Sequence, residues 1–229
     1  MRPAMEDGQF EALRAVMVEE ILAHTRLARA EIGKEALAEA VMRAVGSVPR
    51  HDFVPAELRV YAYADTPLPI GHGKTISQPF IVALMSDLLE PVPGAKVLEI
   101  GTGLGYQAAV LAALGCEVYS VECIEELSAE AAKRLAQAGY KNVALKIGDG
   151  YYGWPERGPF DRIILTAAPE LVPPPLFAQL KPGGRMVAPA GMQNSQQLLL
   201  VEKDARGRLA MREILPVRFS ALDPVERDD

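Results

Sequence analysis

The sequence predicts an α/β fold with a doubly wound, mostly parallel sheet, antiparallel edge strands and an N-terminal helical cap. Between residues 95 and 188, apolar runs of strand length alternate with helical patterns, which is typical of βαβ units in a sheet covered on both faces. The last two strand-like runs are joined by a short polar connection, which indicates an antiparallel hairpin at the sheet edge. Two stretches with helical periodicity precede this region and predict the cap.

Each expected helix of the cap has its apolar residues on one face. In residues 9–24 the apolar side chains recur at steps of three and four, at Phe10, Leu13, Met17 and Ile21. Residues 34–45 repeat the pattern, and Gly46 is expected to end that helix before Pro49. We expect both helices to pack over one side of the core without chemistry of their own.

The segment 64–78 differs in character, because it holds two prolines and two glycines. These residues are expected to exclude a regular element, so the segment is predicted to be a long shaped loop. Long ordered loops in compact domains often carry function. A helix should follow and end before Pro91.

The remaining elements are predicted from apolar runs and turn residues. We expect parallel strands at 96–100, 117–122, 143–147 and 161–166, with helices at 106–114 and 125–138. A short helix to residue 180, a turn at 181–184, a strand at 185–188 and antiparallel strands at 196–202 and 209–217 complete the pattern. We expect one domain over residues 1–229, made of a helical cap (1–60), a substrate loop and helix (61–94) and a cofactor-binding α/β core (95–229).

Composition excludes several classes of protein. The 229 residues carry a net charge of −6 without a run of lysines or arginines, which argues against a nucleic-acid partner. The two cysteines exclude a disulfide scaffold and lack metal-ligand spacing, so no metal is expected. The first residues lack an apolar core, and no apolar run approaches the ~20 residues of a membrane helix. We expect a monomeric cytoplasmic protein that binds no membrane.

A glycine-rich segment, residues 99–106 (EIGTGLGY), joins the first parallel strand to its helix. Glycines allow a tight turn and a close approach to a ligand, and the helix N-terminus offers free N–H groups. The carboxyl ends of the strands, where ligands bind in doubly wound sheets, lie at this point. The third glycine of a dinucleotide fingerprint is replaced by Tyr106, and no phosphate-binding GxxxxGK[ST] loop occurs.

Two acidic residues follow the next strands and complete a candidate ligand site. Glu122 lies 21 positions after Gly101, at the end of the second strand, where a carboxylate can accept both hydroxyls of a ribose. Asp149 follows the third strand within a Gly-Asp-Gly turn, where it either binds an adenine amino group or stabilises the turn. This pattern suits a nucleoside that carries a small zwitterionic tail instead of a pyrophosphate, as S-adenosylmethionine does. A sheet with this loop is Rossmann-like.

Several segments between about residues 48 and 191 resemble the protein-L-isoaspartate O-methyltransferase family. They are residues 65–71 (DTPLPIG), 75–79 (TISQP), 97–103 (VLEIGTG), 148–150 (GDG), 159–161 (PFD) and 180–185 (LKPGGR). The glycine motif alone is typical of any class I methyltransferase, whereas the TISQP segment at its distance before that motif indicates this family.

The resemblance implies methyl transfer from S-adenosylmethionine to the free carboxylate of L-isoaspartyl, and of D-aspartyl, residues in damaged proteins and peptides. The methyl ester would collapse to a succinimide, whose hydrolysis returns some normal aspartate. By the same resemblance, Ser77 would be the catalytic residue, and Ile76, Ser77 and Gln78 would contact the substrate. The cofactor roles would fall on Glu99, Gly101, Thr102, Gly103, Glu122, Asp149 and Gly150.

The residues present suit this chemistry. A carboxylate is already an anionic nucleophile at pH 7, so the reaction needs no general base, and the three histidines form no constellation with a nucleophile. Ser77 has two interpretations, an N-cap of the following helix or a hydrogen-bond donor to the substrate carboxylate beside a helix N-terminus. No Ser–His–acid set accompanies it, so a covalent role is not expected.

The chain departs from the family pattern at two places. Lys74 stands where a glutamine is usual, which adds a positive charge beside the expected substrate channel. Residues 219–222 read FSAL in place of the usual FVPL, in a segment that helps to build the peptide groove in relatives.

Three alternative functions remain open at this point. The chain could methylate another small-molecule or protein nucleophile, or it could bind the cofactor without catalysis. An NAD-dependent oxidoreductase is the third alternative, which Tyr106 and the missing third glycine disfavour.

Overall fold

The computed structural model describes residues 7–223. Residues 1–6 and 224–229 lie outside this range, and with them the last four residues, 226–229 (ERDD), for which the sequence predicts a frayed tail. Among the described residues, no helix has the length and apolar character that crossing a bilayer requires.

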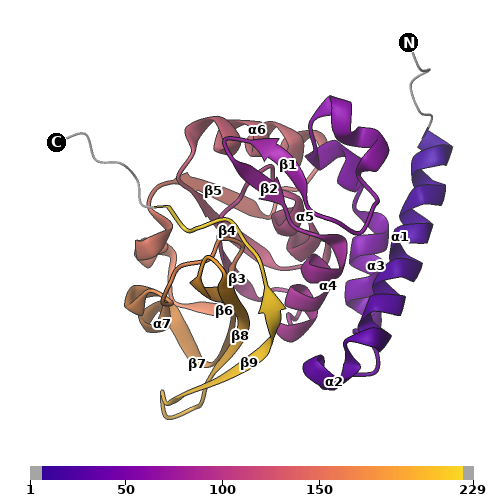
Figure 1. The fold of residues 1–229 in the computed structure, drawn as a ribbon. Coiled ribbons are helices and arrows are strands. Elements are labelled where there is room, and N and C mark those ends of the chain that lie inside the picture. The colour runs from indigo at the N-terminus through magenta and orange to yellow at the C-terminus, as the bar shows by residue number, and fades with distance from the viewer. Residues whose placement is uncertain (1–6, 224–229) are drawn as a thin grey trace.

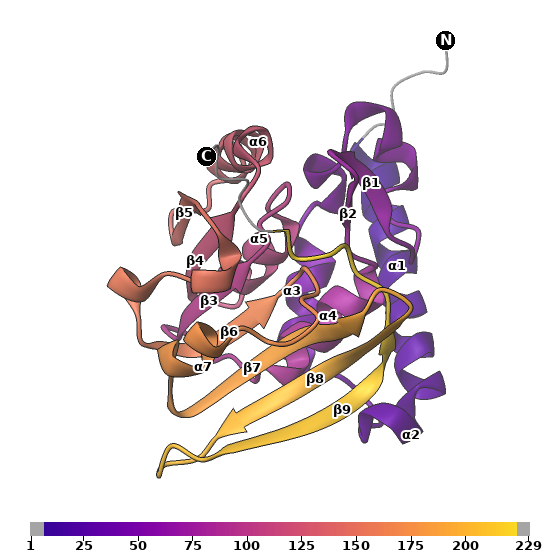
Figure 2. The same cartoon turned by 60° about the vertical axis from the view of Figure 1, so that its left-hand side comes forward.

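A seven-stranded sheet forms the centre of the protein, with the strand order β5-β4-β3-β6-β7-β8-β9 (Figures 1 and 2). Its strands are β3 (Lys96–Ile100), β4 (Glu117–Glu122), β5 (Val143–Ile147), β6 (Phe160–Leu165), β7 (Leu180–Met192), β8 (Ser195–Lys203) and β9 (Leu209–Val217). The first five strands in this order, β5, β4, β3, β6 and β7, are parallel, whereas β8 is antiparallel to both β7 and β9. The predicted fold class is confirmed.

Helices cover both faces of the sheet. One face packs against α3 (Glu39–Ser47), α4 (Pro79–Leu88), α5 (Tyr106–Ala113) and α6 (Glu125–Gln137), and α1 (Asp7–Leu27) packs outside them on α3 and α4 (Figure 1). The other face carries α7 (Pro174–Gln179) and the short 3₁₀ turns η3 (Gly150–Tyr152) and η4 (Pro155–Arg157). One hydrophobic cluster joins side chains of the cap, such as Met17 and Val45, to Val97 in the sheet, which supports the proposal of one domain.

The helix predicted at residues 34–45 begins later and ends later in the structure, as α3 at residues 39–47. The chain forms a short helix α2 (Arg29–Ile32), leaves it at Gly33 in a left-handed conformation, and starts α3 only at Glu39. Gly46 lies inside α3, which ends at Ser47 before Pro49. The apolar spacing was correct, because Leu37, Val41 and Val45 are all buried, but burial of Leu37 does not require a helical backbone.

The segment 64–78 contains a regular element, so the expectation of an irregular loop was wrong. Strands β1 (Leu68–Gly71) and β2 (Lys74–Ile76) form an antiparallel hairpin. Pro69 is tolerated because the hairpin has only two strands and its side chain faces solvent. The connecting residues Gly71, His72 and Gly73 all have positive φ, which explains the two glycines. Two short 3₁₀ helices, η1 (Arg50–Phe53) and η2 (Ala56–Tyr61), precede the hairpin.

The expected turn at residues 181–184 is part of β7, which runs from the end of α7 to Met192. A register irregularity opposite Phe160 and Arg162 of β6 accommodates the glycines of this segment.

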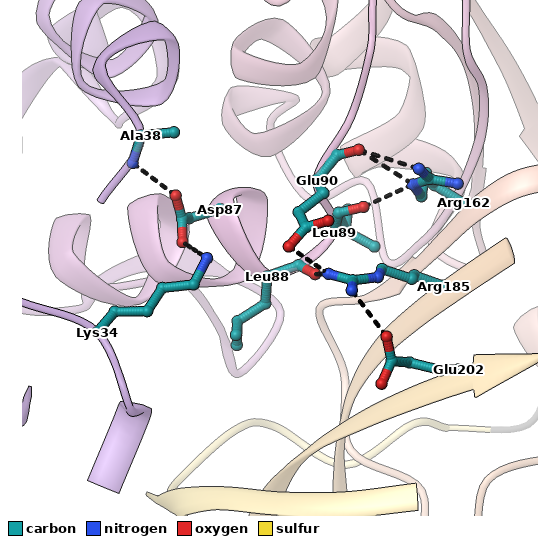
Figure 3. Close-up of polar contacts among 9 residues, drawn as sticks. All are labelled: Lys34, Ala38, Asp87, Leu88, Leu89, Glu90, Arg162, Arg185 and Glu202. Carbon is teal, nitrogen blue, oxygen red and sulfur yellow. Dashed lines mark hydrogen bonds and ion pairs between the residues drawn. The ribbon is translucent and has the colours of Figure 1, made fainter. Parts of the chain in front are cut away.

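The C-terminal end of α4 is held by charged side chains (Figure 3). Arg162 of β6 donates hydrogen bonds to the carbonyl oxygens of Leu89 (2.5 Å) and Glu90 (3.0 Å), which follow the helix. Arg185 of β7 donates to Leu88 O and forms ion pairs with Glu90 and with Glu202 of β8. The last carbonyls of a helix lack partners within it, so these arginines fix the end of α4 to the sheet.

We predict that Arg162→Met lowers the free energy of unfolding by about 1–3 kcal/mol, because two carbonyls lose charge-assisted hydrogen bonds. Urea denaturation measures this change. Replacement of the exposed Arg206 in the β8–β9 connection by methionine is the control and should change stability little. Equal stability of the two variants would contradict this account of the helix end.

Candidate active site

The glycine-rich loop lies at the point where the strand order of the sheet reverses. Strand β3 pairs with β4 on one side and with β6 on the other, so the loops after β3 and β6 start side by side. Thr166 N–H, after β6, donates to Ile100 O at 2.8 Å. Gly101 has a φ of +96°, and a Cβ there would lie 2.6 Å from Thr166 Oγ1, so only glycine fits between the loops.

A cavity of about 500 Å³ opens above this loop. Its wall combines the hairpin and α4, the loop after β3, the end of β4 and the segment that follows β9. Eight of the residues predicted for the site line it: Ile76, Ser77, Gln78, Gly101, Thr102, Gly103, Glu122 and Gly150. The hairpin thus brings the TISQP segment to the glycine loop, although they are more than 20 residues apart in the sequence.

The Glu122 carboxylate is the best-positioned polar group in this wall. It is only 6% exposed, and its Oε1 accepts hydrogen bonds from the N–H groups of Cys123 (3.0 Å) and Ile124 (3.1 Å). Its Oε2 accepts one from Gly103 N–H at 2.8 Å. A carboxylate has about four acceptor positions, so Oε2 keeps one for a ligand hydroxyl.

Two predicted site residues lie outside the cavity wall. Glu99 is fully buried beneath the glycine loop, where its Oε2 accepts a hydrogen bond from Ser120 and its Oε1 has no partner among residues 7–223. Burial raises the pKa of Glu99 to about 8, against the smaller effect of the Ser120 hydrogen bond, and the nearby Glu122 raises it further. Asp149 accepts a hydrogen bond from Tyr151 N–H at 2.9 Å and so stabilises its turn, one of the two interpretations from the sequence.

Gly150, next to Asp149, forms part of the cavity wall itself. A Cβ at this position would lie 2.5 Å from Ile100 Cγ2. Glycine is therefore needed for the turn after β5 to pack against the end of β3.

Ser77 does not occupy the N-cap position. Helix α4 begins at Pro79, so Gln78 is the N-cap residue and Ser77 precedes it. Among the described residues, Ser77 Oγ makes no hydrogen bond, although it lines the cavity. The N-cap interpretation was therefore wrong, and the hydroxyl is available to a ligand at the amino end of α4.

The C-terminal segment closes one side of the cavity, although no sequence motif marks its individual residues as ligand-facing. Residues 216–223 line it, and Ala221 forms a bridge with Ala168 after β6. Lys74 of the hairpin donates to Ala221 O at 3.3 Å and forms an ion pair with Asp223 at 2.5 Å. Lys74, which departs from the family pattern, thus ties the hairpin to this segment.

Comparisons with known proteins show the family of this chain. The family model described as protein-L-isoaspartate(D-aspartate) O-methyltransferase matches residues 23–226. The chain belongs to this family. A protein-L-isoaspartate O-methyltransferase 1 of Polaromonas sp. (strain JS666) is 59% identical over 97% of this chain and 94% of its own length. A protein-L-isoaspartate O-methyltransferase 2 of Syntrophobacter fumaroxidans is 55% identical over 94% of this chain and 88% of its own.

Solved structures of protein-L-isoaspartate O-methyltransferases share the fold. One has a TM-score of 0.79 and 29% identity, covering 93% of this chain and 66% of that protein. Another, a putative member from Plasmodium falciparum in complex with S-adenosyl-L-homocysteine, has a TM-score of 0.71 and 22% identity, covering 90% of this chain and 97% of that protein. The resemblance inferred from the sequence motifs is thereby confirmed.

We predict that the stability of this family member falls as the pH rises through the titration of Glu99. The raised pKa of about 8 means that the folded state holds the Glu99 proton more tightly than the unfolded state, whose carboxyl titrates near 4.5. The Glu99 contribution is therefore fully present below the unfolded pKa and is lost as the pH approaches the folded value, by about a few kcal/mol in total.

Glu99→Gln should flatten this fall, because a neutral amide does not titrate. Urea denaturation at about pH 5 and about pH 8 measures the difference between the two free energies of unfolding. Glu117→Gln, at the exposed start of the neighbouring strand, is the control and should keep the wild-type fall. A Glu99→Gln protein with that same fall would contradict a neutral Glu99.

Proposed function

We propose that the protein transfers a methyl group from S-adenosylmethionine to the free carboxylate of L-isoaspartyl residues, and of D-aspartyl residues, in damaged proteins and peptides. One observation carries the proposal beyond family membership. The unpaired Ser77 hydroxyl, at the amino end of α4, lies in the wall of the same cavity as the glycine loop and Glu122.

The cavity residues fit an adenosyl cofactor. The cavity, with a volume of about 500 Å³, is large enough for a nucleoside cofactor. Glu122 Oε2 can accept a hydrogen bond from a ribose hydroxyl. Gly101 and Gly150 stand where a Cβ would collide with Thr166 and Ile100, so glycine lets the loops after β3 and β5 pack closely where they form the cavity wall. When bound, S-adenosylmethionine supplies an electrophilic methyl group on a sulfonium.

The protein's own part in the reaction is to orient and desolvate the acceptor. The substrate carboxylate is ionised at pH 7 and can attack the methyl carbon without a general base. Ser77 Oγ can donate a hydrogen bond to one carboxylate oxygen, and the amino end of α4 favours the anion there. The other oxygen would then be free to attack the methyl carbon in line with the sulfonium, with S-adenosylhomocysteine as the leaving group.

The test is transfer of labelled methyl to an isoaspartyl peptide and to its aspartyl twin of the same sequence. We expect transfer to the isoaspartyl peptide alone, and a product that loses the label as the ester closes to a succinimide. Equal transfer to both peptides would favour another protein nucleophile as acceptor. Cofactor binding without transfer to either peptide would favour a different acceptor or a non-catalytic module.

The finer expectations on partners and location are part of this proposal. The net charge of −6 favours a monomer that does not associate with nucleic acid. Cys116 and Cys123 are both unpaired, which favours a reducing compartment such as the cytoplasm.

Ser77→Ala should lower kcat strongly and leave cofactor affinity almost unchanged, because the hydroxyl would act on the substrate carboxylate and not on the nucleoside. Methyl-transfer kinetics give kcat, and calorimetry with S-adenosylhomocysteine gives the dissociation constant. A comparable loss in both quantities would assign Ser77 to the cofactor instead.

Glu122→Ala should weaken S-adenosylhomocysteine binding by about 1–3 kcal/mol, or about 5- to 150-fold, because a charge-assisted hydrogen bond is lost. Calorimetry measures this change. Glu117→Ala, at the other end of β4, is the matched control and should bind as the wild type does. If Glu122→Ala bound as tightly as Glu117→Ala, the ribose would be held elsewhere.

A further inference from the structure

The amino end of α4 is capped from outside its own sequence. Pro79 at the first helical position has no N–H, and the side chain of the N-cap residue Gln78 makes no capping hydrogen bond. The N–H of Phe80 donates instead to Asp65 Oδ1 at 2.8 Å. Asp65 lies 15 residues earlier, before the hairpin, and its negative charge suits a helix N-terminus.

The second oxygen of Asp65 binds the residue next to Ser77. Asp65 Oδ2 accepts a hydrogen bond from Gln78 Nε2 at 3.1 Å and contacts His24 Nδ1 of α1. The Asp65 side chain is only 6% exposed, so water cannot easily replace these partners. One buried carboxylate therefore joins α1, the start of the hairpin and the cavity-lining Gln78.

The backbone around Asp65 is itself anchored to the cofactor side of the cavity. Arg50 is fully buried, and its Nε donates to Ala62 O at 2.8 Å. Its guanidinium lies 4.9 Å from the ring centroid of Tyr106, the first residue of α5. Burial lowers the pKa of Arg50 to about 10, and the charge of Asp65 acts in the opposite direction, as expected for neighbours.

The other end of α4 carries a second buried carboxylate, Asp87, which points toward Ala38 and Lys34 (Figure 3) and does not line the cavity. Its oxygens bind Ala38 N–H and Lys34 Nζ, each at 2.6 Å. These contacts tie α4 to the segment that precedes α3, whereas Arg162 and Arg185 tie the end of α4 to the sheet. The position of its first turn relative to the cavity then depends on Asp65.

We propose that Asp65 is a positioning residue for the peptide substrate. By capping α4 and holding the Gln78 side chain, it sets the place of Ser77 and Gln78 opposite the glycine loop. Asp65 does not line the cavity, so it acts through these residues and not by touching the substrate. This inference rests on the proposed function, and it adds to that function the residue that fixes the geometry of the acceptor side.

The test compares Asp65→Asn, at the amino end of α4, with Asp87→Asn, which removes another buried carboxylate charge near the other end of that helix. We expect Asp65→Asn to lower kcat/KM for an isoaspartyl peptide about 10- to 100-fold, because a small displacement of the substrate contacts is costly. Its dissociation constant for S-adenosylhomocysteine should stay within about twofold of the wild-type value. Asp87→Asn should lose stability in urea but keep kcat/KM within about twofold.

Two outcomes would overturn the proposal. One is an Asp65→Asn enzyme with wild-type kcat/KM, and the other is an Asp87→Asn enzyme whose kcat/KM falls as far as that of Asp65→Asn, which would make the effect a matter of stability. If Asp65→Asn does not fold, Gln78→Met removes the Gln78–Asp65 hydrogen bond and leaves the carboxylate in place, although it also changes a side chain that lines the cavity. It should raise KM for the peptide and leave cofactor binding unchanged, and an unaltered KM would also overturn the proposal.

A failure of the proposed function gives a different result. In that case the wild-type protein itself transfers no methyl group to the isoaspartyl peptide. The capping role can still be measured, because hydrogen exchange at the Phe80 amide should accelerate in Asp65→Asn and not in Asp87→Asn. Unchanged exchange in Asp65→Asn would overturn the proposal whether or not the wild type is active.

Discussion

The hydrogen bond from Gly103 N–H to the Glu122 carboxylate ties the glycine loop to the end of the neighbouring strand. Together with the hydrogen bond from Gly101 N–H to Val121 O (2.8 Å) and the contact between the Thr102 and Ser120 hydroxyls, it fixes the loop after β3 relative to β4 and so preforms this part of the cavity wall. The same carboxylate accepts hydrogen bonds from the N–H groups of Cys123 and Ile124, which directly precede α6. A charged group that is buried so well needs these donors, and they in turn hold the loop.

Two acidic residues near the glycine loop, Glu122 and Glu99, differ in their hydrogen-bond partners and therefore in their roles. Glu122 receives backbone donors, whereas Glu99 lies in the core with one oxygen unpaired and a pKa raised to about 8 by burial. A neutral Glu99 avoids placing a second negative charge beneath the same loop. Asp65 acts in a similar way at the other side of the cavity, near Ser77. There its buried carboxylate accepts a hydrogen bond from a backbone N–H of the first turn of α4.

Much of the fold could be predicted because local signals agree with the tertiary arrangement in the α/β core. The strands at 96–100, 117–122, 143–147 and 209–217 have the predicted bounds, since apolar runs between turn residues leave little choice. The prediction failed at residues 34–38 and in the hairpin. There a buried Leu37 imitated a helical pattern, and Pro69 was read as a break although an exposed edge tolerates it.

The sequence by itself determined the strands of the α/β core, the glycine loop and the place of Glu122 at the end of its strand, because these depend on residues close together in the chain. Only the tertiary structure decided that Asp65 caps α4, that Lys74 binds residues 221 and 223, and that Glu99 lies below the cavity and not in its wall. These contacts join segments without a shared local pattern. Their geometry follows from how the helices and the hairpin pack on the sheet, which spacing along the chain does not encode.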